Sequence, residues 1–145
     1  MLKVFNYSHF LYTVLLILLA IIVDQSTKIF ISKIMLENNF NNISVFSFLE
    51  LVFVRNTGIS FGLFSEGGML GRYFFSTFSI SVGLFIAVLA FLAEKKIVFY
   101  GLRLISSGAI ANAIDRVYFG GVIDFLDFFV YNFHWPTFNF ADIFI

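Results

Sequence analysis

Residues 112–142 hold most of the acidic groups of this chain and follow directly on its last long apolar segment. They read N-A-I-D-R-V-Y-F-G-G-V-I-D-F-L-D-F-F-V-Y-N-F-H-W-P-T-F-N-F-A-D. Only 12% of all residues are charged, yet this stretch contains four of the five aspartates, Asp115, Asp124, Asp127 and Asp142. Acids beside apolar segments are costly to desolvate, so a functional role has to be considered for them.

The composition predicts an integral membrane protein. Hydrophobic residues make up 60% of the 145 residues, whereas a soluble domain is typically about 45–50% apolar and about 25% charged. Basic and acidic residues balance at nine each, which gives no indication of a nucleic-acid partner. The chain has no cysteine, which excludes disulfides, thiolate catalysis and zinc-thiolate sites.

Three apolar segments predict membrane-spanning helices at about 10–31, 70–93 and 97–116. In the first, Asp24 and Lys28 lie four residues apart and can pair on one helix face. A cleavable signal peptide is the competing interpretation, but no small-residue cleavage pattern follows Val23, so we expect an uncleaved helix. Small residues in the second half of the third segment indicate close packing against neighbouring helices.

The remaining segments predict a β-rich insertion and a functional loop. Residues 32–69 mix β-branched and aromatic residues with turn-forming asparagines, which predicts a small β-rich extracytoplasmic segment between helices 1 and 2. We expect a catalytic loop at 117–138 and the first turns of a fourth helix at 139–145, with Asn139 as its cap. The chain would then form one mainly α-helical membrane domain, residues 1–145.

Basic residues in short loops predict the orientation, because such loops stay on the cytoplasmic side. Lys3 precedes the first helix, and Lys95 and Lys96 lie between the second and third. With these residues cytoplasmic, polar residues from distant parts of the sequence meet at the outer membrane surface: Asp24, Asn56, Asn112, Asp124 and Asp142.

Two of these carboxylates can form a catalytic pair. Carboxylates that share a site cannot both ionise cheaply, so the pair acts as acid and base at once. Asp124 and Asp142 could in this way hydrolyse a peptide bond without a metal or a cofactor. The alternative for any single acid is an ion pair or a surface position. Asp115 would then pair with Arg116, and Asp127 would face water.

Five motifs, in this order, resemble the bacterial lipoprotein signal peptidase family, signal peptidase II. They are D-Q-S-T-K (24–28), R-N-T-G (55–58), A-N-A-I-D-R (111–116), G-V-I-D-F (121–125) and F-N-F-A-D (138–142). The resemblance implies an aspartic endopeptidase that removes signal peptides from diacylglyceryl-modified prolipoproteins at the outer face of the bacterial cytoplasmic (inner) membrane. It implies Asp124 and Asp142 as the catalytic aspartates. The implied supporting residues are Asp24, Lys28, Asn56, Gly58, Asn112, Arg116 and Asn139.

We further expect a monomer that needs no cofactor and no metal, with lipid-modified prolipoproteins and membrane lipids as its partners. The family has four membrane-spanning helices, and residues 139–145 hold only the start of the last one. We therefore expect Asp142 to lie on a frayed tail and the 145-residue chain to have little or no peptidase activity. A small carrier or channel component that uses carboxylates as a proton relay is the alternative function. An intramembrane aspartyl protease of the G-x-G-D type is a third.

Overall fold

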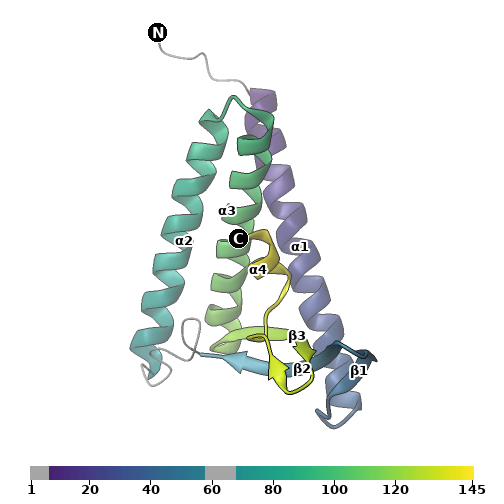
Figure 1. The fold of residues 1–145 in the computed structure, drawn as a ribbon. Coiled ribbons are helices and arrows are strands. Elements are labelled where there is room, and N and C mark those ends of the chain that lie inside the picture. Colours follow the sequence, from purple (N-terminus) through teal and green to yellow (C-terminus); the bar gives the residue numbers. More distant parts are fainter. Residues whose placement is uncertain (1–6, 58–67) are drawn as a thin grey trace.

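The computed structural model describes residues 7–57 and 68–145. Long helices make up most of the described chain, and short strands lie across one end of the helix bundle (Figure 1). The elements in chain order are α1 (Tyr7–Glu37), β1 (Ile43–Phe46), β2 (Leu49–Asn56), α2 (Gly68–Leu92), α3 (Lys96–Phe119), β3 (Val122–Val130), β4 (Phe133–His134) and α4 (Phe140–Phe144).

Helix α1 buries a single narrow stripe, and this stripe explains its length. The buried positions recur every three or four residues, as expected for one face of a helix: Thr13, Ile17, Ala20, Asp24, Lys28, Ile31 and Met35. The helix extends beyond the predicted 10–31 because its last turns cover the sheet, where Ile31 and Met35 pack against Phe125 of β3. Asp24 and Lys28 lie on the buried stripe and therefore need partners inside the protein.

Helices α2 and α3 run side by side, joined by a short turn at the end of the bundle opposite the sheet (Figure 1). They approach closely where Ser106 donates a hydrogen bond to the Gly83 carbonyl at 2.8 Å. A Cβ on Gly83 would lie only 2.8 Å from Cγ1 of Ile110, so this contact requires glycine. Helices α1, α2 and α3 are each long and apolar enough to cross a membrane. The predicted membrane fold with three such helices is confirmed.

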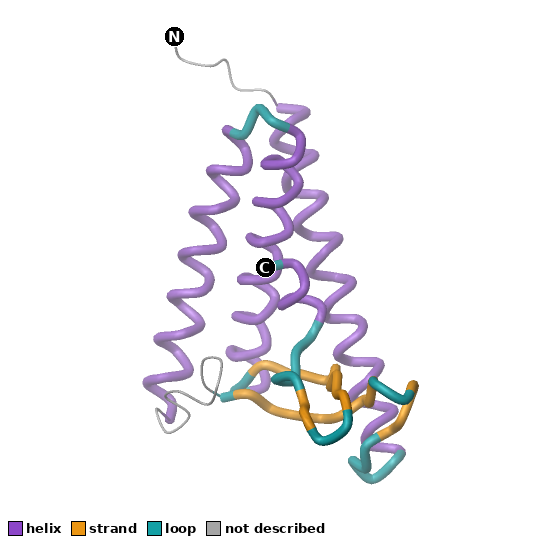
Figure 2. The backbone as a smooth tube through the Cα atoms, in the orientation of Figure 1, coloured by secondary structure: helices purple, strands orange, loops and turns teal. Residues whose placement is uncertain are grey.

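The sheet is antiparallel and combines two distant parts of the chain. In the described residues its strand order is β1-β2-β3-β4, and β2 pairs with β3 from Leu49↔Phe128 to Asn56↔Val122. Figure 2 shows all its strands gathered at one end of the bundle. The predicted β-rich segment between helices 1 and 2 is confirmed. The predicted loop at 117–138 is wrong for residues 122–130 and 133–134, because the β2 backbone supplies a strand partner that local sequence does not reveal.

Two glycines set the geometry that leads into the site. Helix α3 continues to Phe119, past the predicted end at 116, and stops at Gly120, whose φ of 75° is the left-handed conformation that commonly ends helices. Further back on α3, Gly108 leaves space for α4, since a Cβ there would collide with the carbonyl oxygen of Ala141. The short α4 thereby packs directly on α3 and places Asp142 beside it.

Candidate active site

Asp124 lies in the middle of the site, on strand β3, and is 2% exposed. Its Oδ1 accepts a hydrogen bond from Asn139 Nδ2 at 2.7 Å, and its Oδ2 accepts one from Asn56 Nδ2 at 3.1 Å. Desolvation raises the pKa of Asp124 to about 6, and the negative charge of Asp142 adds to the rise. The two amide donors act in the opposite direction. Asp124 is therefore a carboxyl group that can hold a proton near neutral pH.

Asp142 occupies the first turn of α4 and is exposed at the surface. It forms a capping box with Asn139: the Asn139 backbone N–H donates to Asp142 Oδ2, and the Asp142 backbone N–H donates to Asn139 Oδ1, both at 3.1 Å. Asn112 Nδ2 donates to the other carboxylate oxygen at 2.8 Å. The predicted fraying around Asp142 is wrong, because these bonds tie the turn to itself and to α3.

Asn139 joins the two carboxylates. Its side-chain amide donates to Asp124 and also to Asn112 Oδ1 at 3.2 Å, while its backbone holds Asp142. It is fully buried. One residue therefore fixes both aspartates, with the buried Asp124 on one side and the exposed Asp142 on the other. Asn139 was expected to cap the fourth helix, and the structure confirms that cap.

An ion cluster between α1 and α3 supports this arrangement. Lys28 Nζ lies 2.7 Å from Asp24 Oδ2 and 2.6 Å from Asp115 Oδ2, and it donates to Asn112 Oδ1 at 3.1 Å. Lys28 and both acids are at most 1% exposed. Asp24 also accepts a 2.8 Å hydrogen bond from the Ala141 backbone N–H, next to Asp142. The three donors of the ammonium thus connect the helices to the site.

Two expectations about individual acids change in the structure. Asp115 pairs with Lys28, although Arg116 was the expected partner, because Asp115 lies on the face of α3 that packs against α1. Asp127 is 6% exposed and does not face water; its Oδ2 lies 2.8 Å from His134 Nδ1 across the β3–β4 pair. Both acids therefore have structural roles: Asp115 links α3 to α1, and Asp127 links β3 to β4.

The other expected residues are placed as follows. Arg116 is half-buried, donates to the Asn112 carbonyl at 3.3 Å and interacts electrostatically with Asp124 and Asp142. Gly58 lies outside the described residues. Gln25 was not among the predicted site residues, yet its Nε2 donates to Asp115 Oδ1 at 2.7 Å and to the Ala111 carbonyl at 3.3 Å. Its place inside the D-Q-S-T-K motif was the available signal.

The site as a whole offers carboxylates and neutral amides. In the described ranges 7–57 and 68–145, no three His, Asp or Glu side chains are grouped in a way that could hold a metal ion. A buried carboxyl with a raised pKa beside an exposed carboxylate can supply both an acid and a base to a bound amide. An acid and a base of this kind can together promote hydrolysis of an amide by water.

Known proteins share both the sequence and the fold. Residues 16–145 match the family described as signal peptidase (SPase) II. The lipoprotein signal peptidase of Pelagibacter ubique is 37% identical over 142 residues, which cover 97% of this chain and 84% of that protein. The lipoprotein signal peptidase of Cupriavidus necator is 40% identical over 126 residues, covering 86% of this chain and 71% of the relative. A bacterial membrane enzyme solved by the in meso method superposes with a TM-score of 0.72 at 28% identity, over 99% of this chain and 89% of that one. This chain therefore belongs to the signal peptidase II family.

Proposed function

We propose that this chain is an aspartic endopeptidase that removes signal peptides from diacylglyceryl-modified prolipoproteins, with Asp124 and Asp142 as its catalytic pair. The observation that carries the proposal is the double role of Asn139, which binds both carboxylates and holds one buried and one exposed. Family membership supports the reaction class, and the geometry supports the proposed roles of the two aspartates.

In the proposed reaction, Asp142 is the base and Asp124 the acid. Asp142 is exposed and takes a proton from the attacking water, whose oxygen bonds to the scissile carbonyl carbon. Asp124, with its raised pKa, donates its proton to the leaving nitrogen as the C–N bond breaks. The remaining polar residues act on the pair: Asn56, Asn112 and Asn139 orient the carboxylates, and Asp24 with Lys28 holds α4 and Asn112 in place.

We further propose a multi-pass protein of the bacterial cytoplasmic membrane, built as one domain and acting as a monomer. Lys95 and Lys96 are exposed at the end of the bundle opposite the sheet, which supports a cytoplasmic position for that end (Figure 1). Lys3 lies outside the described residues. The sheet and both aspartates would then lie on the extracytoplasmic face, in contact with membrane lipids and lipid-modified substrates.

The alternative of a proton relay across the membrane is not favoured. A relay needs ionisable groups distributed along the spans. In the part of the chain that the structure describes, the buried acids of α1 and α3 are Asp24 and Asp115, and both belong to the cluster at the sheet end.

Cleavage of a diacylglyceryl-modified prolipoprotein by the chain in detergent micelles tests the proposal. We expect Asp124→Asn and Asp142→Asn each to lower the cleavage rate by about 10²–10⁴-fold, the usual effect of losing an acid or base. Asp127→Asn is the matched control, because Asp127 lies on the same strand and bonds His134 outside the pair. A rate that is unchanged by Asp124→Asn or by Asp142→Asn contradicts the pair.

A second measurement does not depend on turnover. We expect the infrared band of a protonated carboxyl group to disappear as the pH rises through about 6, and to be missing from Asp124→Asn but present in Asp127→Asn.

A further inference from the structure

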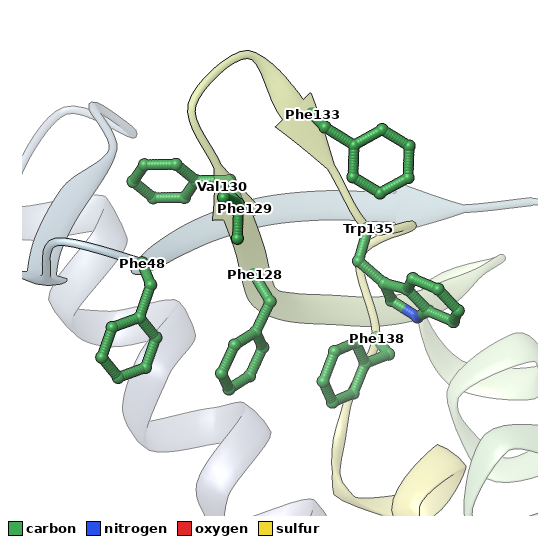
Figure 3. A pocket seen from close by; sticks show the side chains of 7 residues that line it. All are labelled: Phe48, Phe128, Phe129, Val130, Phe133, Trp135 and Phe138. Carbon is green, nitrogen blue, oxygen red and sulfur yellow. The ribbon is translucent and has the colours of Figure 1, made fainter.

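A row of stacked phenylalanine rings lies on the sheet next to the site. Phe46, Phe48, Phe128 and Phe138 follow one another with ring centroids 5.5, 6.1 and 5.7 Å apart. Their planes differ by only 11°, 24° and 12°. In Figure 3 the rings of Phe48, Phe128 and Phe138 point to the same side of the strands, the side on which the helices lie. We call these four residues the phenylalanine row.

Three members of the row, Phe48, Phe128 and Phe138, line an apolar cavity of about 540 Å³. Seven side chains line it, five of them phenylalanines, and Trp135 and Val130 complete the set (Figure 3). This volume is within the usual range of ligand pockets, about 300–1,000 Å³. The lining lacks the polar groups that normally orient a polar ligand. Phe48 is 48% exposed, so much of this surface has no protein partner in the described chain. The cavity is suited to a hydrocarbon chain.

The cavity is lined by backbone segments that also carry residues of the proposed site. Asp124 and Phe128 both belong to strand β3. Four residues of strand separate Asp124 from Phe128 by about 13 Å. Phe138, which stacks on Phe128, directly precedes Asn139, and its carbonyl accepts hydrogen bonds from the backbone N–H groups of Phe125 and Leu126 at 3.1 and 2.9 Å. The same backbone segment positions a cavity wall and the residue that joins both aspartates.

We propose that the phenylalanine row and its cavity bind the acyl chains of the diacylglyceryl group on the substrate cysteine. This inference rests on the proposed function, in which the bond to that cysteine is cleaved. The acyl carbonyl of the modified cysteine lies about seven single bonds from its nitrogen, or about 8 Å when extended. The acyl chains of a substrate held at Asp124 therefore begin just short of Phe128 and run along the row.

Acyl-chain binding at this place would contribute to specificity. The chains leave water or detergent for an aromatic surface, and the gain in free energy scales with the apolar area that they cover. A long chain can contact the whole row, whereas a four-carbon chain ends near its first rings. The row would then favour long-chain over short-chain substrates without any polar contact.

The single tryptophan of the chain provides a direct probe of binding. Trp135 lines the cavity and is the only tryptophan in the sequence, so all tryptophan fluorescence comes from this position. The probe ligand is a lipopeptide with brominated 18-carbon acyl chains, added to the 145-residue chain in unbrominated bicelles. We expect strong quenching of Trp135, and no quenching from a lipopeptide of the same sequence that is brominated on its peptide part and carries butyryl chains.

Bulk bilayer lipid is the competing occupant, and a second arm of the experiment identifies it. Brominated phospholipid bicelles without substrate are titrated with unbrominated long-chain lipopeptide. Under the proposal, the lipopeptide relieves any quenching, because its chains displace lipid from the cavity. Quenching by bulk lipid that the lipopeptide does not relieve would overturn the proposal and assign the cavity to the membrane surface.

A kinetic comparison tests specificity. We expect the double variant Phe48→Ala with Phe128→Ala to lower kcat/KM for a dipalmitoyl substrate about tenfold, and to change that for a dibutyryl substrate less than about twofold. Phe78→Ala is the matched control: Phe78 is exposed on α2 and stacks on Phe74 with centroids 6.3 Å apart, away from the sheet. Equal losses for both substrates would refute the acyl-chain role.

Failure of this inference is distinguishable from failure of the proposed function. If the double substitution leaves the preference for the long-chain over the short-chain substrate unchanged, the row has no role in binding acyl chains, and the peptidase proposal stands. If neither lipopeptide binds or is cleaved, the proposed function itself fails. The binding arms use no turnover, so they decide the inference even when the cleavage rate is low.

Discussion

The two ends of helix α3 bury positive charge in different ways. At the sheet end, Lys28 is 1% exposed and is bound by Asp24, Asp115 and Asn112, which come from two helices. At the opposite end, Arg103 is 2% exposed. It donates to the Phe99 carbonyl at 2.5 Å and to the Thr13 hydroxyl, and its guanidinium lies over the Phe99 ring.

The difference lies in what each cation holds together. Lys28 neutralises two buried carboxylates, and both the Asn112 side chain and the Ala141 backbone depend on the same cluster. Arg103 has neutral partners, one of them in its own turn, and its Nε has no hydrogen-bond partner among the described residues. A cation paired with buried acids is difficult to remove, whereas a cation bound by neutral groups is not essential to its neighbours. The sheet end is therefore expected to tolerate substitution far less.

The largest effect is expected from Lys28→Met. Removing the ammonium leaves Asp24 and Asp115 buried without their cation, which should lower the free energy of unfolding by about 3–5 kcal/mol. The midpoint of unfolding by SDS in mixed micelles measures it. Arg103→Met is the matched substitution at the other end. It should lower the free energy of unfolding by only about 1 kcal/mol, because Thr13 keeps its hydrogen bond to the His9 carbonyl. Equal losses at both ends would contradict the comparison.

A second pair of substitutions separates positioning from stability. Gly108→Ala places a methyl group against the Ala141 carbonyl and should shift α4, together with Asp142. A displacement of about 1 Å at a catalytic group can cost about a hundredfold in rate, and we expect a loss of this size in prolipoprotein cleavage. A Cβ on Gly101 meets nothing within 4 Å.

Gly101→Ala is therefore the matched control on the same helix. It should leave the cleavage rate unchanged and raise stability by up to about 1 kcal/mol, since alanine favours helix over glycine. If Gly108→Ala cleaves substrate at the rate of Gly101→Ala, then α4 is not positioned by its contact with α3.

The smallest expected effect is a pH dependence of stability. The pKa of Asp124 is raised from 3.8 to about 6, mainly by desolvation. A raised carboxyl pKa means that the folded state binds the proton more tightly, so this stabilising contribution is full below about pH 4 and is lost as the pH rises through about 6. Asp124→Asn removes the dependence. The free energy of unfolding of this variant, relative to that of the unsubstituted chain, should rise between pH 4 and pH 7 by on the order of 2–3 kcal/mol. A pH-independent difference would contradict the raised pKa.

Much of the fold could be predicted because membrane-spanning helices have a strong local signal. The apolar segments gave three helices, and the spacing of Asp24 and Lys28 gave an ion pair that the structure confirms at 2.7 Å. Strand β3 was missed because its pairing partner, β2, lies far away in the sequence. The partner of Asp115 was also missed, because adjacent residues of a helix point in different directions and Arg116 therefore lies off the face that meets α1.

The sequence by itself determined the membrane class, the order of the helices and the small set of acids that could carry chemistry, since these follow from composition, segment length and ordered motifs. Only the tertiary structure decided how the residues of 112–142 divide their roles. In the structure, Asn139 binds both Asp124 and Asp142. Asp115 pairs with Lys28, and Asp127 pairs with His134. Stacked phenylalanines lie on the sheet near the pair. The physical reason is that hydrogen bonds and desolvation act between groups that are close in space. Asp24 and Ala141 are in contact although they lie 117 positions apart in the sequence.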